Sequence, residues 1–232
     1  MITAAPHTSL DVAALARSRE DVAVGEEIVR HRYSSRALHW TVALFFFLSL
    51  VSGLPIWTPL FGWMAPLLGG LSMCRVLHPW AGLLFAATSL AMFRHWWRDM
   101  RLRPEDRAWL RPETVVSYLR HTREDALVGK YNGGQKLFFF AVMLGALGLL
   151  VSGVVLWWPT RFPQGVRVAS ILLHEVTFIL FTVAIVFHIY LGTAALPGTF
   201  AAMTRGTVTR AWARVHHPRW YREVTGEDAR GH

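Results

Sequence analysis

The sequence predicts an all-α integral membrane protein, a four-helix bundle with both termini in the cytoplasm. The chain of 232 residues is 53% hydrophobic and only 17% charged, with 11 Trp and 14 Phe. Soluble domains rarely have this composition. Four apolar segments each approach the roughly 20 residues that cross a bilayer. The basic residues lie mostly outside these segments, which predicts a multi-pass membrane protein.

The chain begins with a polar arm, residues 1–30, that mixes acidic and basic side chains. It lacks the apolar core of a signal peptide, so we expect a solvated, partly disordered segment. A four-span domain is expected over 31–200, with spans at 37–57, 77–97, 137–158 and 168–192, and a basic cytoplasmic tail over 201–232. Tryptophans at the span ends form an interfacial belt: Trp40, Trp57, Trp80, Trp96, Trp97, Trp157 and Trp158.

The connections between the spans differ in length and character. Residues 58–74 are rich in Pro and Gly and predict turns, and residues 159–167 form a short Pro-containing link. The connection over 98–136 is long and polar. Within it, Pro112 to Leu127 is expected to form a surface helix with Pro112 in its first turn.

The distribution of charge predicts the orientation. All but three of the 24 Lys and Arg residues lie on the side that holds the arm, the long connection and the tail, and the exceptions are Arg75, Arg161 and Arg167. The positive-inside rule places that side in the cytoplasm. We therefore interpret the net charge of +9 as an orientation signal and not as a nucleic-acid surface.

The fourth span carries two histidines, His174 and His188, which are 14 residues apart. That spacing is close to four helical turns, so both imidazoles leave one face, about 21 Å apart along the axis. A single histidine in an apolar helix is more often hydrogen-bonded than a metal ligand. Here each has a counterpart at its own depth: His39 pairs with His188 on the cytoplasmic side, and His78 pairs with His174 on the far side.

Two pairs of histidines predict two b-type haems. Two axial imidazoles leave no open position on an iron, which favours electron transfer over chemistry at the metal. Zinc would need four ligands in each layer. The chain has one cysteine, Cys74, so a disulfide framework and a covalent CxxCH haem attachment are both excluded.

Glycines on the same helices would leave room for flat rings. Gly82 and Gly192 each lie four residues after a proposed ligand, and Gly53 lies 14 residues after His39. We expect a macrocycle to cover these positions, while helix packing is the alternative for any single glycine. Glu175, beside one proposed ligand, is expected to reach the headgroups, and orienting that ligand is the alternative.

Two polar segments carry a family resemblance. Together with the paired histidines, KYNGGQK at 130–136 and RAWARVHHPRWYRE at 210–223 resemble the gamma subunit of membrane-bound formate dehydrogenases, a di-haem cytochrome b. The likeness runs from Arg32 to Glu223. It implies that the first and fourth spans ligate the cytoplasmic haem and that the second and fourth ligate the other. The longer arm, and Glu175 at a position expected to be small and apolar, depart from the family.

The resemblance also implies a quinone site near the cytoplasmic haem. Its residues in this sequence are Asn132, Gly133, Gly134 and Gln135. The amides would supply hydrogen-bond donors at the start of the third span, and the glycines would let a ring approach the backbone. The alternative is structural, because Asn132 also suits a helix cap and the glycines also suit a turn.

The implied function is electron transfer within a formate dehydrogenase complex of the bacterial inner membrane. Electrons from an iron–sulfur beta subunit would pass through two haems to menaquinone or ubiquinone, while a molybdenum or tungsten alpha subunit oxidises formate. The chain would house the quinone-reduction site, carry none of the formate chemistry and contact lipid, within a higher oligomer of the complex. One alternative is the cytochrome b subunit of a nickel-iron hydrogenase, and another is a transporter or scaffold whose histidines bind nothing.

Overall fold

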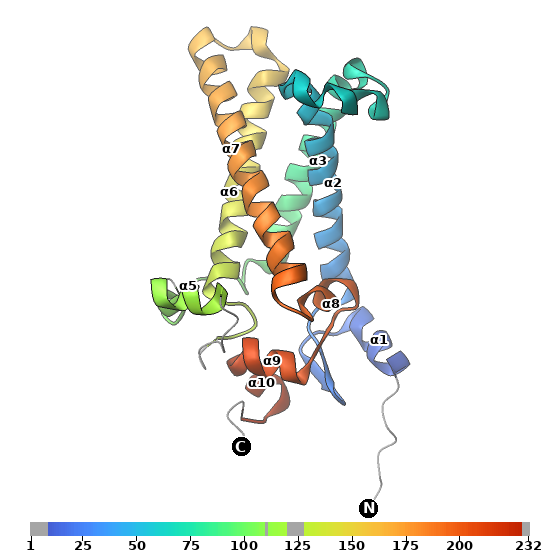
Figure 1. Cartoon of the computed structure of the whole chain (residues 1–232), viewed down its shortest axis with the longest axis vertical. Coiled ribbons are helices and arrows are strands. Elements are labelled where there is room, and N and C mark those ends of the chain that lie inside the picture. Colours follow the sequence, from blue (N-terminus) through green and yellow to red (C-terminus); the bar gives the residue numbers. More distant parts are fainter. Residues whose placement is uncertain (1–8, 110, 120–127, 229–232) are drawn as a thin grey trace, which may run out of the picture. The chain divides into compact units, whose positions relative to one another are not determined.

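A computed structural model describes residues 9–109, 111–119 and 128–228. It contains four long helices, α2 (Tyr33–Trp57), α3 (Leu71–Trp96), α6 (Gly133–Trp157) and α7 (Gln164–Tyr190). Each is long and apolar enough to cross a membrane (Figure 1). The prediction of an all-α, four-span membrane protein is therefore confirmed.

Shorter elements connect and flank these helices. On the N-terminal side of α3 they are α1 (Ser9–Ser18), β1 (Val22–Val24), β2 (Glu27–Val29) and the 3-10 helix η1 (Pro59–Leu68). Between the later spans they are α4 (Asp106–Trp109), α5 (Pro112–Leu119) and η2 (Pro159–Arg161). After α7 they are the π-helical turn η3 (Leu191–Ala195), α8 (Thr199–Thr204), β3 (Thr207–Thr209), α9 (Arg210–His216) and α10 (Pro218–Thr225).

The chain divides into two compact units. The bundle unit comprises Leu38–His95 and Phe140–Ile185, and the terminal unit comprises Met1–Ala37, Trp96–Phe139 and Val186–His232. The bundle unit contains most of each of the four long helices, which run side by side in Figure 1. Their outer surface is apolar, as lipid contact requires: the side chains of Leu144, Leu180 and Leu90 are each more than half exposed.

Three phenylalanines from three helices fill the middle of the bundle unit. The ring of Phe46 lies 5.2 Å from that of Phe181 and 5.8 Å from that of Phe85, measured between centroids. A Cβ at Gly145 would lie 2.5 Å from the Phe181 ring, so this glycine lets α6 approach the cluster.

The largest difference between an expected and an observed span boundary is at the start of the second long helix. The second long helix begins at Leu71, not at Leu77, because η1 occupies the Pro-rich connection and ends at two glycines with positive φ, Gly69 and Gly70. The surface helix α5 begins at Pro112 as expected and is described to Leu119. Its expected continuation to Leu127 lies outside the described residues.

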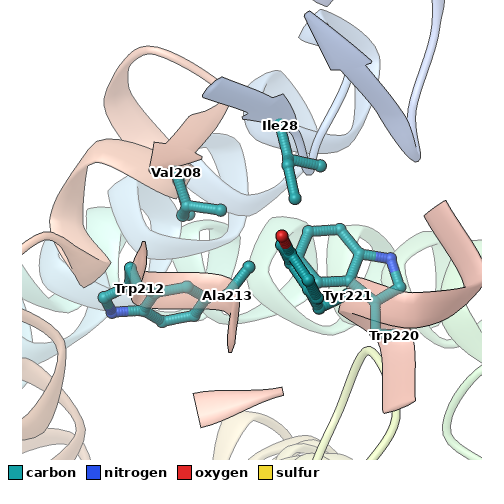
Figure 2. Close-up of a cluster of buried hydrophobic side chains, with 7 residues drawn as sticks. Ile28, Val208, Trp212, Ala213, Trp220 and Tyr221 are labelled. Atoms are coloured by element: carbon teal, nitrogen blue, oxygen red, sulfur yellow. The ribbon is translucent and has the colours of Figure 1, made fainter. Parts of the chain in front are cut away.

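The expectation of a partly disordered N-terminal arm is wrong from residue 9 onward. The arm forms α1 and the hairpin β1–β2, and β2 pairs with β3 in an antiparallel sheet of order β1-β2-β3. One face of the sheet, with Ile28 and Val208, packs on buried residues of the tail, Trp212, Ala213, Trp220 and Tyr221 (Figure 2). The opposite face packs against α1. The tail thus supplies the core that the arm lacks by itself.

Arg30 connects the sheet, the tail and the entry to α6. Its guanidinium lies over three rings, 4.9 Å from that of Trp220, 5.0 Å from that of Trp212 and 5.6 Å from that of Tyr131. It also donates to the carbonyl of Lys130. Cation–π contacts are stronger when desolvated, and Arg30 is 3% exposed. These contacts fix the segment that precedes α6.

Candidate functional site

The structure brings two of the predicted ligands together in the bundle unit. His78 of α3 and His174 of α7 lie with their ring centroids 6.1 Å apart and their planes at 74°. Metal–imidazole bonds are about 2 Å long, so two imidazoles on opposite sides of one metal ion place their centroids roughly 6 Å apart. The observed separation matches that arrangement.

A cavity of about 580 Å³ opens beside the two imidazoles. Its wall is mainly apolar and aromatic, which suits a flat hydrophobic ring. Gly82, where a macrocycle is expected, belongs to this wall, and a Cβ added there would meet nothing within 4 Å. The position therefore has empty space beside it. The residues that line it include Phe46, Leu50, Trp57, Leu83, Phe85, Leu149, Trp157 and Phe178.

Hydrogen bonds fix the tautomer of both histidines. His78 Nδ1 lies 3.0 Å from the carbonyl oxygen of Ser49, which can only accept, so this nitrogen carries the proton. His174 Nδ1 lies 2.9 Å from Ser152 Oγ, and that hydroxyl donates its own proton to the Gly148 carbonyl at 2.6 Å. Both rings therefore keep the Nε2 lone pair for a metal. Sequence reasoning missed Ser49 and Ser152, although polar side chains in apolar spans are a signal.

Gly53 belongs to the cavity wall and also contacts a proposed ligand. A Cβ there would lie 2.7 Å from Cε1 of His78, so the imidazole itself requires the glycine. Coverage of this position by a macrocycle stays a prediction. Gly153 of α6, which sequence reasoning also missed, faces His174, and its added Cβ would lie at an ordinary 3.5 Å from Cε1.

Two charged side chains, Arg75 and Glu175, belong to the cavity wall. Glu175 is expected to reach the headgroups, and the alternative is that it orients or tunes the neighbouring ligand. Its place in the cavity wall is compatible with that alternative. Among the described residues there is no group of three or more His, Cys, Asp or Glu side chains that could hold a metal ion. Two-ligand haem sites fit this donor set better than zinc does.

The other predicted pair is divided between the units. His39 belongs to the bundle unit, where its ring packs edge-on against Trp40 with centroids 5.2 Å apart. His188 belongs to the terminal unit and stacks on Phe138 with centroids 4.7 Å apart and planes at 5°. Gly192 lies in the π-helical turn η3, with nothing within 4 Å of an added Cβ. The pairing of His39 with His188 stays a prediction.

The expected quinone residues form the start of α6. Asn132 Oδ1 accepts from the Gln135 backbone N–H at 2.9 Å, and Gln135 Oε1 accepts from the Asn132 N–H at 3.0 Å. This is a reciprocal capping box. Gly133 and Gly134 pack against Trp109, and a Cβ at Gly133 would lie 2.8 Å from that residue's Cβ. Capping and packing thus explain the four residue types, and quinone contact there stays a prediction.

Comparisons with known proteins point to one family. The family model described as prokaryotic cytochrome b561 matches residues 30–206. The nitrate-inducible formate dehydrogenase cytochrome b556(Fdn) subunit of Escherichia coli K12 is 36% identical over 207 residues, which cover 88% of this chain and 94% of that protein. The formate dehydrogenase cytochrome b556(fdo) subunit of the same strain is 37% identical over 204 residues, 86% and 94% of the two chains. The formate dehydrogenase cytochrome b556 subunit of Haemophilus influenzae is 35% identical over 212 residues, 89% and 87%.

Proposed function

Because the chain belongs to the prokaryotic cytochrome b561 family, with formate dehydrogenase cytochrome b556 subunits as its relatives, we propose that it carries electrons from an iron–sulfur subunit to quinone. It is a multi-pass inner-membrane b-type cytochrome of the formate dehydrogenase kind. The route of the electrons, the number of haems and the quinone are the proposed parts.

The observation that carries the proposal is the pair of neighbouring imidazoles, His78 and His174, beside an apolar cavity. Bound there, haem b would supply one-electron transfer. The two histidines would hold it through Nε2, and Ser49 and Ser152 would keep each Nδ1 proton in place. The aromatic wall would exclude water, which is one of the means by which proteins set a haem potential.

A second haem is proposed at His39 and His188. The 14-residue spacing of His174 and His188 is close to four helical turns, which supports two ligands on one face of the fourth span. The positive-inside rule supports a cytoplasmic position for His188. Electrons would therefore enter at the His78–His174 site, cross to the second site and reduce menaquinone or ubiquinone, which takes protons from the cytoplasm.

The partners are proposed from the relatives. Their names place them in formate dehydrogenases, which supports an iron–sulfur beta subunit and a molybdenum or tungsten alpha subunit for this chain. Affinity purification of the tagged chain from its native membrane should recover a formate-oxidising complex. Recovery of a hydrogenase instead would replace this proposal with the nickel-iron alternative.

The haem proposal is tested by counting haems. A pyridine haemochrome assay should find two b haems per native chain and one in His78→Ala or His174→Ala. His95→Ala, which alters another histidine of α3 that was not proposed as a ligand, should keep both. Full haem content in His78→Ala would refute the ligation.

A further inference from the structure

Two segments of the bundle unit repeat one pattern. Residues 50–59 read LVSGLPIWTP and residues 150–159 read LVSGVVLWWP, with Leu, Val, Ser, Gly, Trp and Pro at the same places. The first copy closes α2 and the second closes α6, and a 3-10 helix begins at the proline of each, Pro59 and Pro159. Each copy faces one of the two histidines: Gly53 faces His78 and Gly153 faces His174.

The serines of the two copies make the same local bonds. Ser52 Oγ donates to the carbonyl of Leu48 at 2.6 Å and lies 3.3 Å from that of Ser49. Ser152 Oγ lies 2.6 Å from the carbonyl of Gly148 and 3.3 Å from that of Leu149. Both serines are buried, with 1% and 0% of their surface exposed. Their helical environments are therefore matched.

The copies differ in how they meet their histidine. In the first, the imidazole of His78 donates directly to a main-chain carbonyl, that of Ser49. In the second, the imidazole of His174 has the equivalent main-chain carbonyl, that of Leu149, as one acceptor. It has a second acceptor in the hydroxyl of Ser152, whose Oγ lies 2.9 Å from Nδ1. The Ser152 hydroxyl donates its one hydrogen bond to the Gly148 carbonyl, so it can only accept a hydrogen bond from His174.

We propose that Ser152 is a positioning residue that sets the electron affinity of the His78–His174 haem through the Nδ1–H of His174. The proposal rests on the haem site proposed above. An acceptor at Nδ1–H makes Nε2 a stronger donor to iron and so favours the oxidised metal. It also fixes the angle of the imidazole plane about the iron–nitrogen axis. The repeat thus holds both ligands, and its second copy adds one side-chain acceptor to one of them.

The test compares Ser152→Ala with the matched variant Ser52→Ala in the complete complex. Potentiometric titration of the two haems, followed by absorbance, should show the His78–His174 haem shifted to a more positive midpoint in Ser152→Ala. Its low-spin electron paramagnetic resonance g values should shift as well, because they report the axial imidazoles. In Ser52→Ala both readouts should equal those of the native complex, since His78 bonds the Ser49 carbonyl and not this hydroxyl.

The outcomes separate this inference from the haem site on which it rests. Unchanged midpoint and g values in a fully loaded Ser152→Ala variant, or a negative shift, would overturn the role of Ser152 and leave the ligation intact. If Ser152→Ala loses the haem, Ser152→Thr, which keeps a hydroxyl, should restore it, and failure to do so would also overturn the role. Retention of both haems by His174→Ala would instead overturn the haem site itself.

Discussion

Gly53 shows how a single residue determines the position of a ligand. The nearest atoms to its missing side chain belong to the imidazole of His78, whose Cε1 and Nδ1 would lie 2.7 and 2.9 Å from an added Cβ. Such distances are well inside van der Waals contact, so any side chain must move the ring. Gly153 holds the equivalent place near His174, where a Cβ would make only an ordinary contact at 3.5 Å.

This difference predicts unequal effects of alanine at the two glycines. Gly53→Ala should displace His78 and cost about 1–3 kcal/mol of stability, the usual range for overpacking a filled site. The absorbance and midpoint of the His78–His174 haem should change with it. Gly153→Ala should leave the stability of the protein and the absorbance and midpoint of this haem nearly native. Equal behaviour of the two variants in redox-difference spectra would contradict the assignment of Gly53 to the imidazole.

At the scale of an element, the start of α6 serves two purposes that can be separated. The side-chain oxygens of Asn132 and Gln135 cap the helix, while the amide –NH₂ groups are the donors proposed for a quinone. Asp retains the cap oxygen of Asn, and Glu retains that of Gln, but neither retains the donor. Lys136 adjoins this cap and is itself held by an ion pair with Asp106 at 2.7 Å.

Two double variants should therefore behave differently if the amides bind quinone. Asn132→Asp with Gln135→Glu should keep a stable α6 and reduce both haems with formate, yet slow quinone reduction about tenfold or more, the loss expected from roughly 1.4 kcal/mol of binding. Asn132→Ala with Gln135→Ala should show the same slow turnover and lose about 1 kcal/mol of helix stability as well. Native turnover in the Asp/Glu variant, with unchanged inhibitor binding, would remove the quinone site from these residues.

At the scale of the whole molecule, the chain builds a polar unit from segments that lie far apart in the sequence. The terminal unit buries His217, whose Nδ1 lies 2.7 Å from the Gly129 carbonyl and whose neighbours include Arg30, His216 and two tryptophans. Burial first, and then the charge of Arg30, hold the pKa of His217 well below its ordinary value of 6.5. For Glu20, burial raises the pKa, but the charge and hydrogen bond of Lys130 outweigh it and lower the pKa below 4.5.

Both groups predict that acid weakens the terminal unit, in two steps. Below about pH 6.5 the unfolded chain protonates His217 while the folded chain does not, so stability falls by at most about 1.4 kcal/mol per pH unit. A second loss begins below about pH 4.5, where the unfolded chain protonates Glu20 and the folded ion pair with Lys130 resists protonation. The protection factors of residues 20–30 and 207–224, obtained from hydrogen exchange of the intact protein after correction for the intrinsic exchange rate at each pH, should fall from pH 7.5 to 5.5.

His217→Gln is the control for the first step, because its amide can still donate to the Gly129 carbonyl but does not titrate in this range. Its protection factors should be nearly equal at pH 7.5 and 5.5. A native-like fall in the protection factors of the Gln variant would assign the acid sensitivity to another group.

The sequence by itself determined the features that depend on local pattern. Hydropathy over about 20 residues defined the four spans, and the helical period placed His174 and His188 on one face, because both properties are set by residues near one another in the chain. The tertiary structure decided what depends on distant partners: the arm is folded because Trp212, Trp220 and Tyr221 cover its sheet. It also determines that Ser49 and Ser152 accept hydrogen bonds from the two imidazoles and that Trp109 packs against the glycines of α6. These are contacts between side chains from different elements, and no local period or composition encodes which of them meet.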